Sequence, residues 1–326
     1  RKPLILQGAR QVGKTYSILE FGRTCYENVA YFNFETNPKL NETFAENISP
    51  DYLIPILSHI AGQTIIREKT LIVFDEVQLC ERALTSLKYF CEDAPEYHII
   101  VAGSLLGVAV NRTRFSFPVG KVDMKTLYPM DMEEFMLAMG EEQLVELIKK
   151  CFQTDTPMPA ALHDAAMQLY RQYLVVGGMP ECVMQFIQTK DYILVRNTQN
   201  TILASYLNDM SKYNNLSEIK KTRLAYDNIT VQLSKKNTRF QYKLIKKGGR
   251  ASEFENAIEW LCLSGIVSQV YKVEQVKKPL ENYRDIDAFK IYVSDLGLLC
   301  AKKELLANDI LYMVCLLYTS PSPRDS

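Results

Sequence analysis

Apolar positions in the first hundred residues follow two patterns that alternate along the chain. Four short, mainly apolar runs have the length and character of strands, and one of them, Leu71–Phe74, is continuously apolar like a fully buried strand. They are Leu4–Leu6, Ala30–Phe34, Leu71–Phe74 and His98–Ala102. Stretches with helical spacing lie between them, at 14–21, 39–46, 51–61 and 83–90. Strands that alternate with helices predict a parallel sheet with right-handed crossovers, so we expect an α/β domain over residues 1–130.

The rest of the chain has a different pattern. Residues 131–213 have almost continuous helical spacing, broken at 155–159 and at 177–180, and we expect a helical lid domain there. From about Leu216, two or three helices precede alternating apolar positions near 266–273 and 289–293. Helices followed by a hairpin predict a winged-helix module over residues 214–314.

Both ends of the chain differ from this pattern. Residues 315–326 read CLLYTSPSPRDS, and most of this string is what a transposase-type sequencing-library adapter encodes. We expect the segment to be an adapter-derived artefact outside the fold, with the gene truncated near Val314. A natural Ser/Pro-rich tail is the alternative. Because the chain starts at Arg1 and enters a strand almost at once, we also expect an N-terminal piece to be missing.

Composition excludes some classes of protein. A hydrophobic content of 47% with 23% charged residues indicates a globular chain rather than a disordered or fibrous one. Lysine plus arginine equals aspartate plus glutamate, at 38 each, so net charge gives no reason to expect nucleic acid or an anionic membrane. The eight cysteines form no C-x-x-C pair and the three histidines are far apart, which argues against zinc.

The chain also lacks targeting signals of the common kinds. No apolar run approaches the roughly 18 residues of a membrane span, and no signal-peptide pattern opens the sequence. We therefore expect a cytoplasmic location.

The loop after the first predicted strand has the spacing G-x-x-x-x-G-K-S/T. Glycines permit positive φ, so that successive N–H groups turn inward on a β-phosphate. The lysine then reaches the β- and γ-oxygens, the threonine hydroxyl binds Mg²⁺, and the helix N-terminus adds partial positive charge. The predicted nucleotide-binding residues are Gly8, Ala9, Arg10, Gln11, Val12, Gly13, Lys14, Thr15 and Tyr16.

An acidic pair, Asp75 and Glu76, ends the third apolar run. The carboxyl ends of parallel strands face such a loop, so Asp75 is expected to hold Mg²⁺ with Thr15, and Glu76 to orient the attacking water. Two carboxylates that merely cap the next helix are the alternative. Ser104, after the fourth run, is placed to bond the γ-phosphate or the water, or else is a turn residue.

Further charges and one missing motif bear on the ligand. Candidates to stabilise charge on the γ-phosphoryl group are Arg10, Arg112, Arg114 and Lys121, each of which is otherwise a solvated surface charge. Since no N/T-K-x-D guanine-reading motif is present, adenine is the expected base.

Seven basic residues within a run that contains no acid could contact DNA phosphates, or form a solvated face. They are Lys235, Lys236, Arg239, Lys243, Lys246, Lys247 and Arg250.

Eight segments occur in an order that resembles a family of prokaryotic AAA-superfamily ATPases with a C-terminal domain of unknown function. They are QGARQVGKT, FNFE, LIVFDEVQ, VAGSLLG, SFPVGKV, LYPMDMEEF, GGMPE and FKIYVSDLGLL. The resemblance covers nearly all of residues 1–314. It implies that Lys14, Thr15, Asp75 and Glu76 bind and hydrolyse ATP, and that 177–180 belongs to a helical lid against the nucleotide. Family members usually continue into a region similar to restriction-endonuclease folds, which this chain does not reach.

Three classes of function remain open. The first is an ATPase that uses hydrolysis to rearrange a bound partner, DNA or protein. The second is a slow nucleotide-gated switch in which Glu76 hydrolyses rarely. The third is a P-loop phosphotransferase that acts on a small molecule, although no acceptor-binding motif is recognisable in the sequence.

Overall fold

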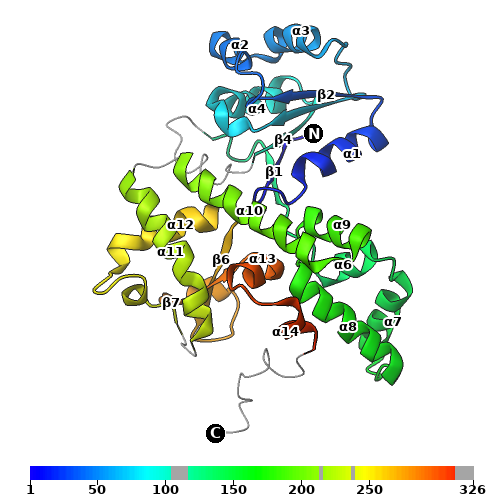
Figure 1. Ribbon diagram of the computed structural model, residues 1–326. Coiled ribbons are helices and arrows are strands. Elements are labelled where there is room, and N and C mark those ends of the chain that lie inside the picture. The colour runs from blue at the N-terminus through cyan, green and yellow to red at the C-terminus, as the bar shows by residue number, and fades with distance from the viewer. Residues whose placement is uncertain (104–116, 213–215, 236–238, 313–326) are drawn as a thin grey trace. The chain divides into compact units, whose positions relative to one another are not determined.

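The computed structural model describes residues 1–103, 117–212, 216–235 and 239–312 (Figure 1). Several residues singled out in the sequence lie outside these ranges, so their predictions stay untested. They are Ser104, Arg112, Arg114, Lys236 and the segment 315–326.

The chain divides into two compact units. The first consists of Arg1–Tyr128 with Glu259–Ile266, and the second of Pro129–Ile258 with Val267–Ser326. No helix in the described ranges is long and apolar enough to cross a membrane.

A five-stranded sheet forms the centre of the first unit. Its strands are β1 (Leu4–Gln7), β2 (Asn28–Asn33), β3 (Thr70–Asp75), β4 (His98–Ala102) and β5 (Asp123–Thr126). They lie in the order β2-β3-β4-β1-β5, and every neighbouring pair is parallel. The four apolar runs therefore form strands, and the predicted parallel α/β fold is confirmed.

The fifth strand was not predicted from the sequence. All four residues of β5 are exposed, so the strand has no apolar pattern to reveal it. It is held by its backbone register on β1, in which Leu4 pairs with Asp123 and Gln7 with Thr126.

Helices cover both faces of this sheet. They are α1 (Lys14–Cys25), α2 (Leu40–Glu46), α3 (Pro50–Ala61) and α4 (Glu81–Asp93), with a short 3₁₀ turn η1 (Val77–Leu79). Strand β3 is buried along its whole length, and its alternate side chains reach opposite faces. Leu71 and Val73 pack with Ile18 of α1, whereas Ile72 and Phe74 pack within the larger core formed with α2, α3 and α4.

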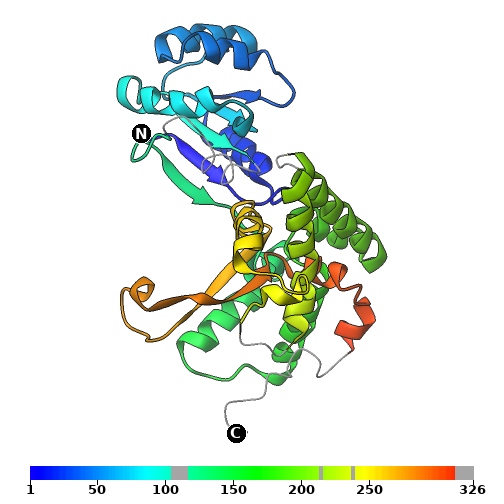
Figure 2. The same cartoon turned by 90° about the vertical axis from the view of Figure 1, so that its left-hand side faces the viewer.

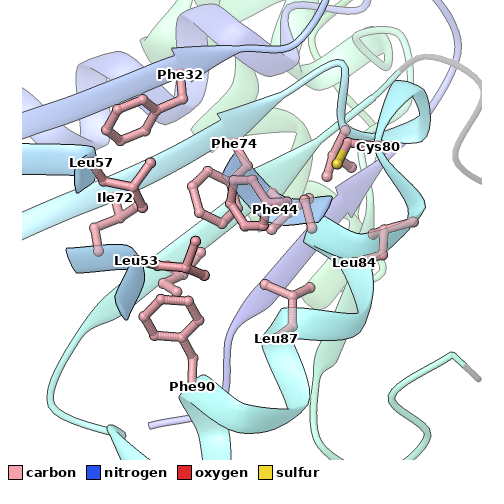
Figure 3. Packing of buried hydrophobic residues seen from close by; sticks show 14 of the residues in the cluster. Phe32, Phe44, Leu53, Leu57, Ile72, Phe74, Cys80, Leu84, Leu87 and Phe90 are labelled. Atoms are coloured by element: carbon pink, nitrogen blue, oxygen red, sulfur yellow. The ribbon is translucent and has the colours of Figure 1, made fainter. Parts of the chain in front are cut away.

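Figure 3 shows this larger core, in which Phe74 lies among side chains from three helices. Phe44 of α2 meets the Phe74 ring edge to face, at a centroid distance of 5.5 Å. Leu53 of α3 and Leu87 of α4 are both fully buried beside it. Burial of this kind stabilises by roughly 1.5–3 kcal/mol for each large side chain, and it fixes the end of β3, where the acidic pair stands.

The second unit is mainly helical. Its helices are α6 (Met132–Ala138), α7 (Glu142–Gln153), α8 (Ala160–Val176), α9 (Pro180–Thr189), α10 (Tyr192–Lys212), α11 (Leu216–Ser234), α12 (Ala251–Leu263), α13 (Leu296–Lys302) and α14 (Ala307–Leu311), with 3₁₀ turns η2 (Tyr242–Leu244) and η3 (Leu280–Tyr283). The predicted breaks fall between α7 and α8 and between α8 and α9. The last part of α12, from Glu259 on, is counted with the first unit.

An antiparallel hairpin completes the second unit and extends as a long ribbon in Figure 2. It pairs β6 (Val267–Val273) with β7 (Arg284–Val293). The second strand begins earlier than predicted, because pairing continues past an irregularity between Tyr271 and Lys272. The helices α13 and α14 were also not predicted. The winged-helix assignment itself stays a prediction.

Candidate nucleotide-binding site

The loop between β1 and α1 depends on two glycines. Gly13 has a left-handed conformation, with φ 91°, at the residue before α1. Gly8 has φ 147°, and a Cβ atom there would lie 2.2 Å from the carbonyl oxygen of Leu127. Leu127 is held at this place by its own N–H group, which donates to the Gln7 carbonyl at 2.8 Å. Any larger residue at position 8 would therefore displace either the loop or the segment after β5.

Lys14 lies within this loop with only 7% of its surface exposed. Its Nζ donates to the carbonyl oxygens of Gly8, at 2.9 Å, and of Ala9, at 2.7 Å. Burial lowers the pKa of Lys14 to about 8, against the opposing effect of the Glu76 and Asp75 carboxylates. An ammonium group with little water around it is strongly attracted to an anion, and the first-turn N–H groups of α1 are the usual donors to a phosphate.

The acidic pair meets the loop through Asp75, which is 4% exposed. The Thr15 hydroxyl donates to Asp75 Oδ2 at 2.8 Å. The other oxygen of this carboxylate, Oδ1, accepts the backbone N–H of Glu76 at 3.0 Å. Two segments far apart in sequence are thus joined at the point where the sequence analysis expected Mg²⁺ to bind.

Glu76 has an unusual backbone for a residue with a side chain. Its φ of 52° and ψ of 37° are left-handed, and it stands between β3 and η1. Such a conformation costs of order 1 kcal/mol or more and recurs at functional sites. The Gln78 amide donates to the Glu76 carboxylate, so the side chain is held at the same edge of the sheet as Asp75.

Tyr31 belongs to this site and was missed in the sequence. Its hydroxyl donates to Asp75 Oδ2 at 2.7 Å and accepts from Asn33 Nδ2 at 3.2 Å. Burial is the largest cause that raises its pKa to about 12, and the hydrogen bond to Asp75 acts in the same direction. The only signal was a tyrosine in the second apolar run, which becomes informative once β2 is known to pair with β3.

The oxygen donors of this site suit Mg²⁺, which prefers hydroxyl, carboxylate and phosphate oxygens. Thr15 and Asp75 would hold the ion. No group of three or more His, Cys, Asp or Glu residues in the described ranges could hold a metal by itself. Because Thr15 and Asp75 supply only two ligands, a magnesium ion here would also be bound by nucleotide phosphates, as is usual for this metal.

Other sequence candidates are less closely tied to the site. Lys121 forms an ion pair with Glu92 at 2.8 Å. The side chain of Tyr16 is 73% exposed, so only its backbone N–H group would face a phosphate.

Residues 177–180, predicted to contact the nucleotide, belong to the second unit and meet two other motifs there. The N–H group of Gly178 donates to Asp295 Oδ2 at 2.6 Å, and the Gly178 carbonyl accepts from Met130 at 2.8 Å. The other carboxylate oxygen accepts from the Leu298 N–H group at 2.8 Å. Burial raises the pKa of Asp295 to about 6. This junction joins the segments LYPMD, GGMP and SDLGL.

The described residues of the basic run have different surroundings. Lys235 and Arg239 line a pocket with Lys290 of β7, whereas Lys246 is paired with Glu253 at 3.1 Å. The helix that precedes the hairpin, α12, has exposed positions that carry no cation. They are Ala251, Ser252, Glu255, Asn256 and Glu259. This face of α12 is therefore poorly suited to DNA phosphates.

The fold and the site define a P-loop nucleotide-binding protein. Two family models match the chain: one described as an AAA domain, over residues 1–136, and one described as a domain of unknown function (DUF8612), over residues 167–309. Residues 1–136 are thus similar to AAA domains, a class of P-loop protein, and residues 167–309 to a domain of unknown function. This confirms the resemblance drawn from the eight segments.

A solved structure supports the fold. The Walker-type ATPase PABY2304 of Pyrococcus abyssi is 12% identical over 92% of this chain and 91% of its own, with a TM-score of 0.55. The ORC2 protein of Aeropyrum pernix is 11% identical over 95% of this chain and 88% of its own, with a TM-score of 0.41, too low to carry an argument. No curated protein sequence matches the chain significantly.

Proposed function

We propose that the first unit binds ATP with Mg²⁺ and hydrolyses it, and that hydrolysis rearranges a bound partner. The observation that carries this proposal is the 2.8 Å hydrogen bond from Thr15 to Asp75, because it brings the phosphate loop and the acidic pair into one site. A helix-capping role for the acidic pair would not require that contact.

Each residue has a separate role in this proposal. Backbone N–H groups from Gly8 to Tyr16 surround the phosphates, and Lys14 neutralises their charge. Thr15 and Asp75 hold Mg²⁺, which supplies charge stabilisation to the phosphoryl group when bound. Glu76 orients the attacking water, and Ser104 is assigned to the γ-phosphate by its place after β4.

The remaining assignments are also proposals. Residues 131–213 would act as the lid and 214–314 as a winged-helix module, with DNA or protein as the partner. Adenine is preferred because the sequence has no guanine-reading motif.

Two variants test the site. Glu76→Gln keeps the shape of the side chain but not its charge, so MgATP should still bind while steady-state turnover falls about 10²- to 10⁴-fold. Lys14→Ala should instead weaken ATP binding by roughly 10- to 150-fold, the value of one charge-assisted contact. Binding is measured by calorimetry and turnover by phosphate release. Unchanged affinity in Lys14→Ala, or equal turnover in Glu76→Gln and the parent, would remove the assignment.

A nucleotide-gated switch with slow turnover is the second candidate, and the contact from Gln78 to Glu76 favours it. While the amide holds this carboxylate, Glu76 is restrained from orienting water. Under this candidate, Gln78→Ala raises turnover in the same assay, whereas under the first it leaves turnover unchanged or lowers it.

A further inference from the structure

A small basic pocket lies in the second unit, remote in sequence from the phosphate loop. It has a volume of about 150 Å³. Its described lining residues are Gln232, Leu233, Lys235, Arg239, Phe240, Lys290, Ile291 and Tyr292. Three of these residues are cationic and none is acidic, so the pocket is a local concentration of positive charge in a chain without net charge.

Among the described residues, the three cations of this pocket have no acidic partner in an ion pair. Within the described part of the chain, neither an ion pair nor a side-chain hydrogen bond engages Lys235, Arg239 or Lys290, whereas Lys246 of the same basic run is bound to Glu253. Three unpaired cations around one hollow repel one another and are stabilised by an anion that enters it.

The wall of the pocket is fixed by a buried amide. Gln232 of α11 is 8% exposed; its Nε2 donates to the Gln241 carbonyl at 2.8 Å, and its Oε1 accepts the Gln241 N–H at 3.2 Å. The adjoining Phe240 N–H donates to the Phe289 carbonyl at 2.7 Å, and the two phenyl rings stack at 5.6 Å. The segment that carries Arg239 is thus anchored to both α11 and β7, so the cations converge on a preformed site.

Two features favour an extended polyanion over a free phosphate ion. Tyr292 is 41% exposed and lies two positions after Lys290 on the same face of β7, where its ring can stack on a base. Further exposed cations, Lys243, Lys247 and Arg250, follow along the same segment.

We propose that this pocket holds a backbone phosphate of a nucleic-acid strand, gripped by Lys235, Arg239 and Lys290, with a neighbouring base stacked on Tyr292. The contact surface is therefore the pocket at the edge of β7, not the acidic exposed face of α12. The nucleic-acid strand would be the partner that the proposed ATPase rearranges, and only this part of the inference rests on the proposed function. Binding is measured without ATP, so either proposal can fail while the other stands.

The test compares two triple variants with the same loss of charge. The first is Lys235→Gln with Arg239→Gln and Lys290→Gln, which empties the pocket of cations. The matched control is Lys243→Gln with Lys246→Gln and Lys247→Gln, in the same basic run but outside the pocket. Fluorescence anisotropy follows a labelled single strand of about 20 nucleotides, longer than one typical site, and a duplex of the same sequence across a salt series.

We expect the pocket variant to lose at least about tenfold in affinity at low salt and to flatten the log–log salt slope by about one unit, since the phosphate held in the pocket contributes roughly −0.7 to −0.9. The control triple removes cations that attract the strand only from outside the pocket, so it should lose clearly less affinity than the pocket variant. Tyr292→Ala should weaken the single strand more than the duplex. Circular dichroism checks that each variant folds. The single variant Lys290→Gln, which lies on β7, should show part of the loss in affinity.

Three outcomes overturn the proposal. The first is that the parent binds neither strand at low salt. The second is that the control triple loses as much affinity as the pocket triple, or more. The third is that the parent binds inorganic phosphate but neither strand, and that the pocket triple no longer binds phosphate. The last outcome would make the pocket a site for free phosphate.

Discussion

The two units bury charges of opposite sign beside glycines, and the difference separates a site for a ligand from an internal joint. In the first unit the buried charge is the Lys14 ammonium, held by two carbonyl oxygens of its own loop. In the second it is the Asp295 carboxylate, which accepts N–H groups from Gly178 and Leu298. Lys14 can exchange the carbonyl oxygens of a single loop for phosphate oxygens, whereas N–H groups from separate segments hold those segments together.

The surroundings of Gly8 and Gly178 differ in the same way. At Gly8 the close neighbour is the single carbonyl of Leu127, and the rest of the loop curves around Lys14. At Gly178 a Cβ atom would lie 1.9 Å from the Met130 carbonyl oxygen, in a contact already closed by the hydrogen bond from Met130. Glycine near a buried charge therefore indicates close backbone packing in both places. It indicates a ligand site only where the charged group can replace its protein contacts by contacts with a ligand.

The largest effect is expected from Gly178→Ala. The added methyl group has no room beside Met130, so the second unit should lose about 3 kcal/mol or more of unfolding free energy. Gly140→Ala is the matched control: it has open space but a φ of 83°, and should cost only about 1–2 kcal/mol. Urea unfolding measures both. Equal costs would mean that the Gly178 contact relaxes and is no fixed joint.

The charge in the joint predicts a dependence of stability on pH. The pKa of Asp295 is about 6 in the folded chain, against an ordinary 3.8, so the folded state binds its proton more tightly than the unfolded state. The contribution of the protonated carboxyl to the free energy of unfolding is fully present below about pH 4. It is lost as pH rises through 6, which lowers the free energy of unfolding by roughly 3 kcal/mol. The neighbouring groups Tyr173, Cys182 and Tyr206 have raised pKa values and do not ionise in this window.

Asp295→Asn isolates this contribution. Its amide cannot ionise, so the unfolding free energy of the parent minus that of the variant should fall by roughly 3 kcal/mol between pH 4 and pH 7, while carboxylates elsewhere cancel. Denaturant titrations at four pH values across this range give the difference. If the unfolding free energy of the parent minus that of the variant stays constant or rises with pH, the three segments hold the carboxylate in its charged form. The contrast with Lys14 would then lose its basis.

The sequence predicted the first unit well because its signals are local. Continuous apolar runs mark strands buried on both faces, and the phosphate loop is a single contiguous motif, so neither requires knowledge of the fold. Strand β5 escaped because its four side chains are all exposed and only its backbone joins the sheet.

The contacts that the sequence did not predict join distant positions. Gly178 and Asp295 are 117 positions apart, and the resemblance supplied their motifs without their contact. The basic run was predicted as one face, but Lys290, which faces the same pocket as Lys235 and Arg239, comes from a strand much later in the chain. Pairings of this kind follow from the tertiary fold and have no period or motif in the sequence.

The smallest effect is predicted for Tyr31→Phe, which tests how exchangeable the nucleotide site is. The variant loses the hydroxyl that donates to Asp75 at 2.7 Å but keeps the ring, while Thr15 still donates to the same oxygen. A single hydrogen bond to a charged acceptor that retains another donor is worth about 1 kcal/mol. The apparent affinity for MgATP should therefore fall about fivefold, with a higher Mg²⁺ requirement and little change in turnover at saturation.

Tyr26→Phe is the matched control for this change. Its hydroxyl bonds His98 Nδ1 at 3.0 Å, at the start of β4 and so at the opposite edge of the sheet from the acidic pair. The control should cost similar stability and leave the Mg²⁺ requirement unchanged. If both variants shift it equally, Tyr31 acts through general stability. If neither variant shifts the Mg²⁺ requirement, Asp75 needs no second hydroxyl. The hydrogen bond from Thr15 alone then positions the carboxylate to bind the ion.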